Sequence, residues 1–345
     1  MKNPYAGLPS SRYWKTGVSD QHPFTIEDLY KKKFNLTPDM QIATAGSCFA
    51  QHIGTNLKRS GYRVLDLEPA PRAMSPQTAL KYGYGIYSAR YGNIYSARQL
   101  LQLAKEAFGE GSPVDAIWEK DGRYYDALRP AVEPTGLSSR DEVLQHRAAH
   151  LANVRSMLTQ MNLFIFTLGL TEAWVHRESG TVYPTAPGTI AGTFDPAVYE
   201  FKNFRYGEVL SDMLEFREFI RGKNPSVKFL LTVSPVPLTA TATDNHVLVA
   251  TTYSKSVLRG VAGELSETFK DVDYFPSYEL IASPFSRGFF YSPNLRSVEA
   301  NGVQSVMRVF FDQHKAKLVK GAPSEVAPGL DDVMCEEVLL EAFAK

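Results

Sequence analysis

The stretch QIATAGSCFAQHIGTNLKRSGYRVLDL, residues 41–67, decides the fold. It opens with a short apolar run at 41–45, which is typical of a buried strand, and that run ends abruptly at Gly46. Ser47 and Cys48 come next, and an amphipathic segment follows at once. A hydroxyl and a thiol therefore stand at a predicted strand-to-helix junction, where either side chain could be a nucleophile or could simply pack.

The pattern that starts here continues along the chain. Residues 50–60 have helical apolar spacing, Gly61 is placed to end that helix as a C-cap, and 62–67 predict a second strand. The unbroken apolar run at 162–170 indicates a sheet covered on both faces. Strands alternating with helices predict an α/β fold with a mostly parallel sheet. Further strands are expected at 227–235 and 272–280, and further helices at 96–111, 138–161, 207–222, 246–269 and 297–318.

The same pattern divides the chain into a main domain and two flanking segments. Residues 1–40 show little periodicity and predict an arm wrapped on the domain. The main domain is expected at 41–320, with insertions at about 112–137 and 171–206, where short strand-like pieces alternate with Pro- and Gly-rich turns. Residues 321–345 remain as a C-terminal tail. A length of 345 residues allows one large domain of this kind.

Composition excludes several kinds of partner. Lys plus Arg and Asp plus Glu number 37 each, so the net charge is zero and no basic field invites nucleic acid. Cys48 and Cys335 are the two cysteines, too few for a disulfide framework. We find no apolar run of about 18 residues that could span a membrane and no secretory signal, so a cytoplasmic location is expected. The oligomeric state is left open.

Polar and turn-forming residues cluster just after four of the predicted strands. In a parallel α/β sheet, ligands bind beyond the carboxyl ends of the strands. Because the four clusters follow separate strands, the fold would bring them together at one candidate site. They are Gly46-Ser47-Cys48, Gly169-Leu170-Thr171-Glu172, Ser234-Pro235-Val236-Pro237 and Phe275-Pro276-Ser277-Tyr278-Glu279.

Ser47 has two interpretations. A serine on a tight strand-to-helix turn can project its hydroxyl at the sheet edge, beside helix N–H groups that can hold a developing oxyanion. The alternative is a helix N-cap, a position that serine favours. Cys48 is a rival nucleophile, although a cysteine outside a disulfide is usually buried and points into the core.

These residues carry a resemblance. The sequence GSCFA, residues 46–50, is the name-giving motif of the GSCFA family, a branch of the SGNH/GDSL-like hydrolases, and the chain resembles that family over about 40–312. The resemblance implies a three-layer α/β/α, flavodoxin-like domain of the SGNH type. The other matching stretches are YGNIYSARQLLQL (91–103), TLGLTEAW (167–174), TVSPVPLTAT (232–241), YSKSVLR (253–259) and YFPSYEL (274–280).

The resemblance also implies roles for single residues. Ser47 takes the place of the nucleophile, and the backbone N–H of Gly92 would donate to the oxyanion together with the N–H of Ser47 or Cys48. Thr171 stands where SGNH enzymes carry the oxyanion-hole Asn, and a hydroxyl is a shorter donor than an amide. Asn93 could supply the missing amide.

The base is not apparent from the motifs. SGNH enzymes take it from an Asp-x-x-His after the last strand, and residues 292–297 contain neither residue. His246 is one candidate, because a helix N-terminus beyond a strand end keeps an imidazole neutral. Glu279 is the second. His146 and His150 have the i, i+4 spacing of metal ligands but no third ligand nearby, so we expect surface side chains and no metal.

The predicted function is a serine-dependent esterase that acts on acyl esters, most simply O-acetyl esters, of a small molecule or carbohydrate. Asn93, Glu172 and Arg296 are assigned to substrate binding, and Arg296 could hold a carboxylate or phosphate. An SGNH mechanism needs no cofactor. One alternative is a carbohydrate O-acyltransferase that uses the same serine. An alternative of another class is a ligand-binding protein that keeps the pocket without turnover.

Overall fold

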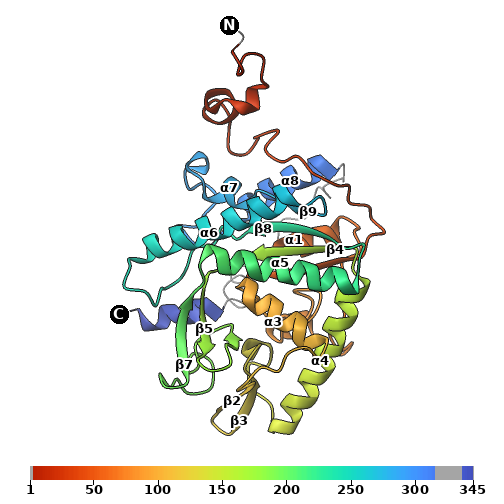
Figure 1. The fold of residues 1–345 in the computed structure, drawn as a ribbon, viewed down its shortest axis with the longest axis vertical. Coiled ribbons are helices and arrows are strands. Elements are labelled where there is room, and N and C mark those ends of the chain that lie inside the picture. Colours follow the sequence, from red (N-terminus) through yellow and green to blue (C-terminus); the bar gives the residue numbers. More distant parts are fainter. Residues whose placement is uncertain (1–2, 315–335, 345) are drawn as a thin grey trace.

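A four-stranded parallel sheet forms the centre of the protein (Figure 1). The structure is a computed structural model, and it describes residues 3–314 and 336–344. The strand order is β1-β4-β8-β9, and Val64 adds a parallel bridge to Ile42 outside β1. Counted along the chain, this is the flavodoxin-like order 2-1-3-4-5. The strands are β1 (Ile42–Gly46), β4 (Leu163–Leu168), β8 (Lys228–Val233) and β9 (Val272–Tyr274).

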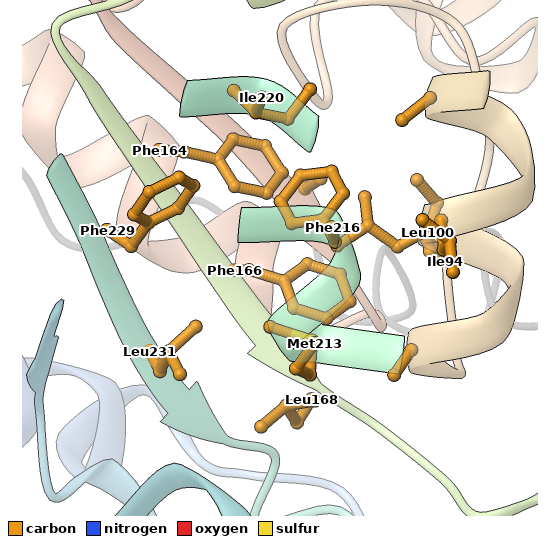
Figure 2. Packing of buried hydrophobic residues seen from close by; sticks show 14 of the residues in the cluster. Ile94, Leu100, Phe164, Phe166, Leu168, Met213, Phe216, Ile220, Phe229 and Leu231 are labelled. Carbon is orange, nitrogen blue, oxygen red and sulfur yellow. The ribbon is translucent and has the colours of Figure 1, made fainter. Parts of the chain in front are cut away.

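Helices cover both faces of this sheet. Neighbouring residues in each strand point to opposite sides, so a strand that is apolar throughout needs a helix layer on each face. Phe164 and Phe166 of β4 pack in one core with α3, α4 and α5, whereas Ile165 packs in a second core with α1 and α8. Figure 2 shows the first core, in which Phe216 of α5 lies against the phenylalanines of β4. The predicted three-layer α/β/α class is confirmed. The helices are α1 (Ala50–Arg59), α2 (Pro76–Lys81), α3 (Ala97–Ala107), α4 (Arg140–Gln160), α5 (Tyr206–Lys223), α6 (Val247–Thr268), α7 (Ser277–Ala282) and α8 (Ala300–His314).

Two predicted strands are shorter than expected. The strand expected at 62–67 makes only the bridge at Val64, because the chain then turns so that Leu67 bonds to Ser88. The strand expected at 272–280 stops at Tyr274. Pro276 has no N–H to continue the ladder, and α7 begins directly after it.

Two small sheets lie at one end of the domain. β2 (Ile117–Lys120) and β3 (Arg123–Asp126) form a hairpin, and β5 (Glu172–His176) pairs with both β6 (Val182–Tyr183) and β7 (Tyr199–Asn203). The sheets share a core, so the two insertions support each other. That core contains Trp118, Tyr125, Ala127, Tyr183, Ala191 and Tyr199.

The described end segments run along the main domain. Ile26, Tyr30 and Leu36 of the N-terminal segment are buried in the core beside α1 and α8, while its first residues extend away from the domain (Figure 1). The short helices are η1 (Ser10–Arg12), η2 (Lys15–Ser19), η3 (Pro130–Val132), η4 (Pro284–Ser286) and η5 (Glu336–Phe343). Within the described part of the chain, no helix combines the length and the apolar character that crossing a membrane requires.

Candidate functional site

The Ser47 turn begins at a glycine that no other residue could replace without rearrangement. Gly46 has φ = 140°, and a Cβ there would lie 2.5 Å from the carbonyl oxygen of Thr167 on β4. The Ser47 N–H donates to that same oxygen over 3.3 Å. This N–H is therefore engaged with the sheet, and its role toward the oxyanion stays a prediction.

The side chain of Ser47 does not cap the helix that follows. α1 starts at Ala50 with Phe49 in the N-cap position and no side-chain cap. Ser47 is 4 % exposed, and its Oγ has no hydrogen-bond partner among the described residues. The N-cap alternative is therefore wrong. A buried hydroxyl without a hydrogen-bond partner lowers the stability of the fold. Its presence therefore calls for an explanation other than a contribution to stability.

The loop after Gly92 packs directly on this turn. Ile94 donates its N–H to the carbonyl of Gly46 over 2.9 Å. The Tyr87 hydroxyl lies 3.1 Å from the carbonyl oxygen of Ser47 and 2.7 Å from Oδ1 of Asn93. Asn93 is thus joined to the serine turn through one phenol.

Asn93 and its neighbours surround a carboxylate. Nδ2 of Asn93 donates to Oε2 of Glu336 over 2.5 Å, and the Tyr95 hydroxyl donates to the same oxygen over 2.7 Å. Gly92 has φ = 68°, and a Cβ on it would lie 3.7 Å from the other carboxylate oxygen. Two of the residues predicted to stabilise an oxyanion, Gly92 and Asn93, therefore face an anionic group in the structure.

The end of β4 supplies the opposite wall. A Cβ on Gly169 would lie 3.0 Å from Cβ of Ser47. Thr171, two residues later, is buried, and its N–H donates to Oγ of Ser254 over 3.1 Å. Its own hydroxyl has no partner in the described parts of the chain. Cys48 is buried as well, as expected for a thiol that packs.

The two predicted bases are engaged elsewhere. His246 is exposed and caps α6, where its Nδ1 accepts from the N–H of Leu248 over 3.1 Å. The Glu279 carboxylate accepts from Nε of Arg259 over 2.5 Å and from the Tyr274 hydroxyl over 2.7 Å. Neither hydrogen-bonds to Ser47, so a role as base stays a prediction for both.

Glu172 and Arg296 belong to different parts of the chain: Glu172 begins β5, and Arg296 precedes α8. Glu172 borders a pocket of about 190 Å³ with Trp174 and Phe201, and its carboxylate accepts from the Thr241 hydroxyl over 2.8 Å. Burial raises the pKa of Glu172. Arg296 lies in the turn before α8, where its N–H donates to Oδ1 of Asn294. The structure thus places a carboxylate in an aromatic pocket beside the end of β4.

Lys255 is a residue that the sequence analysis missed. It lies on α6, is 3 % exposed, and donates from Nζ to the carbonyl of Gly169 over 2.7 Å. It therefore brings an ammonium group to the peptide that packs on Ser47. The signal available was its place in YSKSVLR, where the lysine lies three positions before the buried Leu258 and so shares a helix face with it.

A buried network of charged side chains binds the backbone of the 88–93 loop. Glu68 accepts from the N–H of Arg90 over 2.6 Å and contacts Nδ1 of His150 at 2.7 Å. Arg129 joins the network through Asp126 and donates to the carbonyl of Arg90. The expectation that His150 lies at the surface is wrong, because α4 turns it inward to meet Glu68. Within 3–314 and 336–344, no group of three His, Cys, Asp or Glu side chains could hold a metal ion.

The chain matches a known protein family. No curated protein matches the chain. A family model described as the GSCFA family matches residues 41–310, which spans the sheet, the Ser47 turn, the 91–95 loop and α6. The chain belongs to the GSCFA family.

Proposed function

We propose that the protein is a serine-dependent esterase of the SGNH type, which acts on small acyl esters such as O-acetyl esters, including those of carbohydrates. One observation carries the proposal. Oγ of Ser47 is held at the carboxyl end of a central strand without a described partner, beside a loop whose Asn93 and Tyr95 donate to an anionic oxygen. Nucleophile and oxyanion donors are the two parts that acyl transfer requires.

In the proposed reaction Oγ of Ser47 attacks the ester carbonyl carbon and loses its proton. The carbonyl oxygen becomes an oxyanion, for which the donors are the N–H groups of Gly92 and Cys48, the Thr171 hydroxyl and Nδ2 of Asn93. The alcohol then leaves with a proton, and water cleaves the acyl-serine to give the carboxylic acid and the original serine.

The proton acceptor is the part that the geometry supports least. His246 and Glu279 stay candidates that would have to leave their present partners. Lys255 is a third candidate, because its Nζ lies 2.7 Å from the carbonyl of the glycine that packs on Ser47. A lysine in a buried site can lose its proton near neutral pH and then accept one from serine.

The test is hydrolysis of p-nitrophenyl acetate by the wild type and by S47A and C48A. The proposal expects S47A to lose turnover by at least about a thousandfold while C48A keeps most of it, since triad serines have effects of that size. The variants H246Q, E279Q and K255M then identify the base by their loss of turnover. Equal turnover in S47A and the wild type would reject the serine mechanism.

A ligand-binding protein without turnover is the second candidate. The observation that favours it is the absence of any hydrogen-bonded base on Oγ of Ser47 among the described residues. It expects no turnover in the wild type, together with binding of the intact ester. The acyltransferase alternative expects instead that the acetyl group appears on an added sugar, which mass spectrometry of the products would detect.

A further inference from the structure

The described C-terminal helix reaches the candidate site at two points. Glu336, the first residue of η5, is 4 % exposed and lies between Asn93 and Tyr95. Leu340 lies four positions later and lines the pocket that contains Glu172 and Trp174. Both contacts come from the same eight-residue 3-10 helix. In Figure 1, η5 is the blue helix that ends at the C label, and it lies near β5.

The two contacts of the Asn93 amide agree on its orientation. A carboxylate only accepts, so Nδ2 faces Glu336, and Oδ1 accepts from the Tyr87 hydroxyl over 2.7 Å. The backbone of Tyr95 is also fixed, because its carbonyl accepts from the N–H groups of Gly169 and Leu170. Two donors therefore converge on one oxygen from supports that do not involve η5.

Gly92 keeps the third side of this space open. A Cβ there would lie 3.7 Å from Oε1 of Glu336 and also 3.7 Å from Val132. The remaining space between these groups is only about 10 Å³, about the size of one water molecule. The carboxylate of Glu336 thus fills a site of its own size.

We propose that Asn93 and Tyr95 form a binding site for small monocarboxylates such as acetate, and that Glu336 occupies this site within the same chain. The identity of the ligand as the acid product rests on the proposed esterase function, because hydrolysis of an acyl ester leaves such an acid. An acyl group and the Glu336 carboxylate would then compete for the same donors. A tethered competitor reduces the apparent affinity for a free ligand to the fraction of time that it leaves the site vacant.

The binding experiment titrates acetate into the full-length wild type, E336A and E341A. Glu341 lies on the same helix and is exposed, so E341A is the matched control. We expect Kd for acetate to fall by about tenfold or more in E336A and to stay unchanged in E341A. In the double variant E336A/N93A the gain should disappear. Equal Kd values in the wild type and E336A would overturn the proposal, as would a gain that N93A leaves intact.

An activity experiment separates this proposal from the proposed function. If both hold, E336A raises kcat/KM for p-nitrophenyl acetate severalfold, and adding S47A removes the turnover. If Glu336 were a catalytic group, E336A would lower kcat. That result would contradict the proposal that Glu336 is a competitor for the site. If no variant hydrolyses the ester, the esterase proposal fails, while the acetate titration still decides whether Glu336 occupies a carboxylate site.

Discussion

Gly169 packs directly on Ser47, and a methyl group on this glycine would lie 3.0 Å from Cβ of the serine. The contact joins the ends of two neighbouring strands, since β1 and β4 are in register from Ile42 with Leu163 to Gly46 with Thr167. The carbonyl of Gly169 also accepts from Lys255. One small residue therefore sets the position of the candidate nucleophile and of the nearest buried ammonium group.

The first prediction follows from this close contact. G169A should shift the Ser47 side chain by a few tenths of an ångström and lower esterase turnover by about tenfold or more, because misplaced groups lose catalysis steeply. The control is G207A on α5, where an added methyl meets nothing within 4 Å. G207A should keep full turnover and gain stability, as Gly-to-Ala changes in helices do. Equal turnover in both variants would show that the contact does not position Ser47.

The second prediction concerns the stability of Ser47 itself. S47A should raise the free energy of unfolding by about 1 kcal/mol, because it removes a buried hydroxyl that has no described partner. S286A should lower it by about the same amount, since the buried Ser286 hydroxyl donates to the carbonyl of Ile281 over 2.7 Å. Urea unfolding of both variants measures the difference. A loss of stability in S47A would mean that the hydroxyl is bonded in solution.

The third prediction concerns the Tyr87 hydroxyl, which joins the serine turn to Asn93. Y87F should leave the protein folded and lower kcat for p-nitrophenyl acetate by about tenfold, because the Asn93 amide loses the contact that orients it. Y183F is the matched control, since the Tyr183 hydroxyl donates to the carbonyl of Val114 and makes no contact with Asn93 or Ser47 among the described hydrogen bonds. If Y87F and Y183F have the same kcat, Asn93 does not act in the reaction.

The fourth prediction is a loss of stability in mild acid. Burial and the charge of Arg129 lower the pKa of His150 from its usual 6.5 to about 4. Between pH 6.5 and 4, His150 therefore takes up a proton in the unfolded chain but stays neutral in the folded protein. The free energy of unfolding falls as the pH falls through this window. The slope is at most about 1.4 kcal/mol per pH unit for this one proton.

The same network adds a second loss at lower pH. Burial raises the pKa of Glu68, but the hydrogen bonds from His150 and from the N–H of Arg90, together with the charge of Arg129, outweigh it and hold that pKa below its usual value. The ionised Glu68 carboxylate contributes fully to the free energy of unfolding above about pH 4.5, and this contribution is lost as the pH falls further. Urea unfolding at pH 7 and pH 5 checks the first window. H150Q should flatten the dependence there, while H146Q, at an exposed position, should keep it.

Much of the fold could be predicted because its signals are local. The apolar runs, Ser139 as the cap of α4 and the turn glycines each depend on neighbours within a few positions. The strand at 62–67 failed because pairing depends on a distant partner, and the chain leaves β1 after Val64. Ser47 and Asn93 were found from motifs. Lys255 lies in the matching stretch YSKSVLR but was not singled out there, and Glu336 lies outside every matching stretch.

The sequence by itself determined a parallel sheet with a serine at a strand-to-helix turn, because hydrophobic period and turn chemistry are properties of short stretches. Only the tertiary structure decided which side chains surround that serine. Asn93 meets Glu336 across 243 positions, and Lys255 meets Gly169 across 86. Such contacts depend on the direction of each side chain after the helices have packed on the sheet, and no local pattern in the chain records that direction.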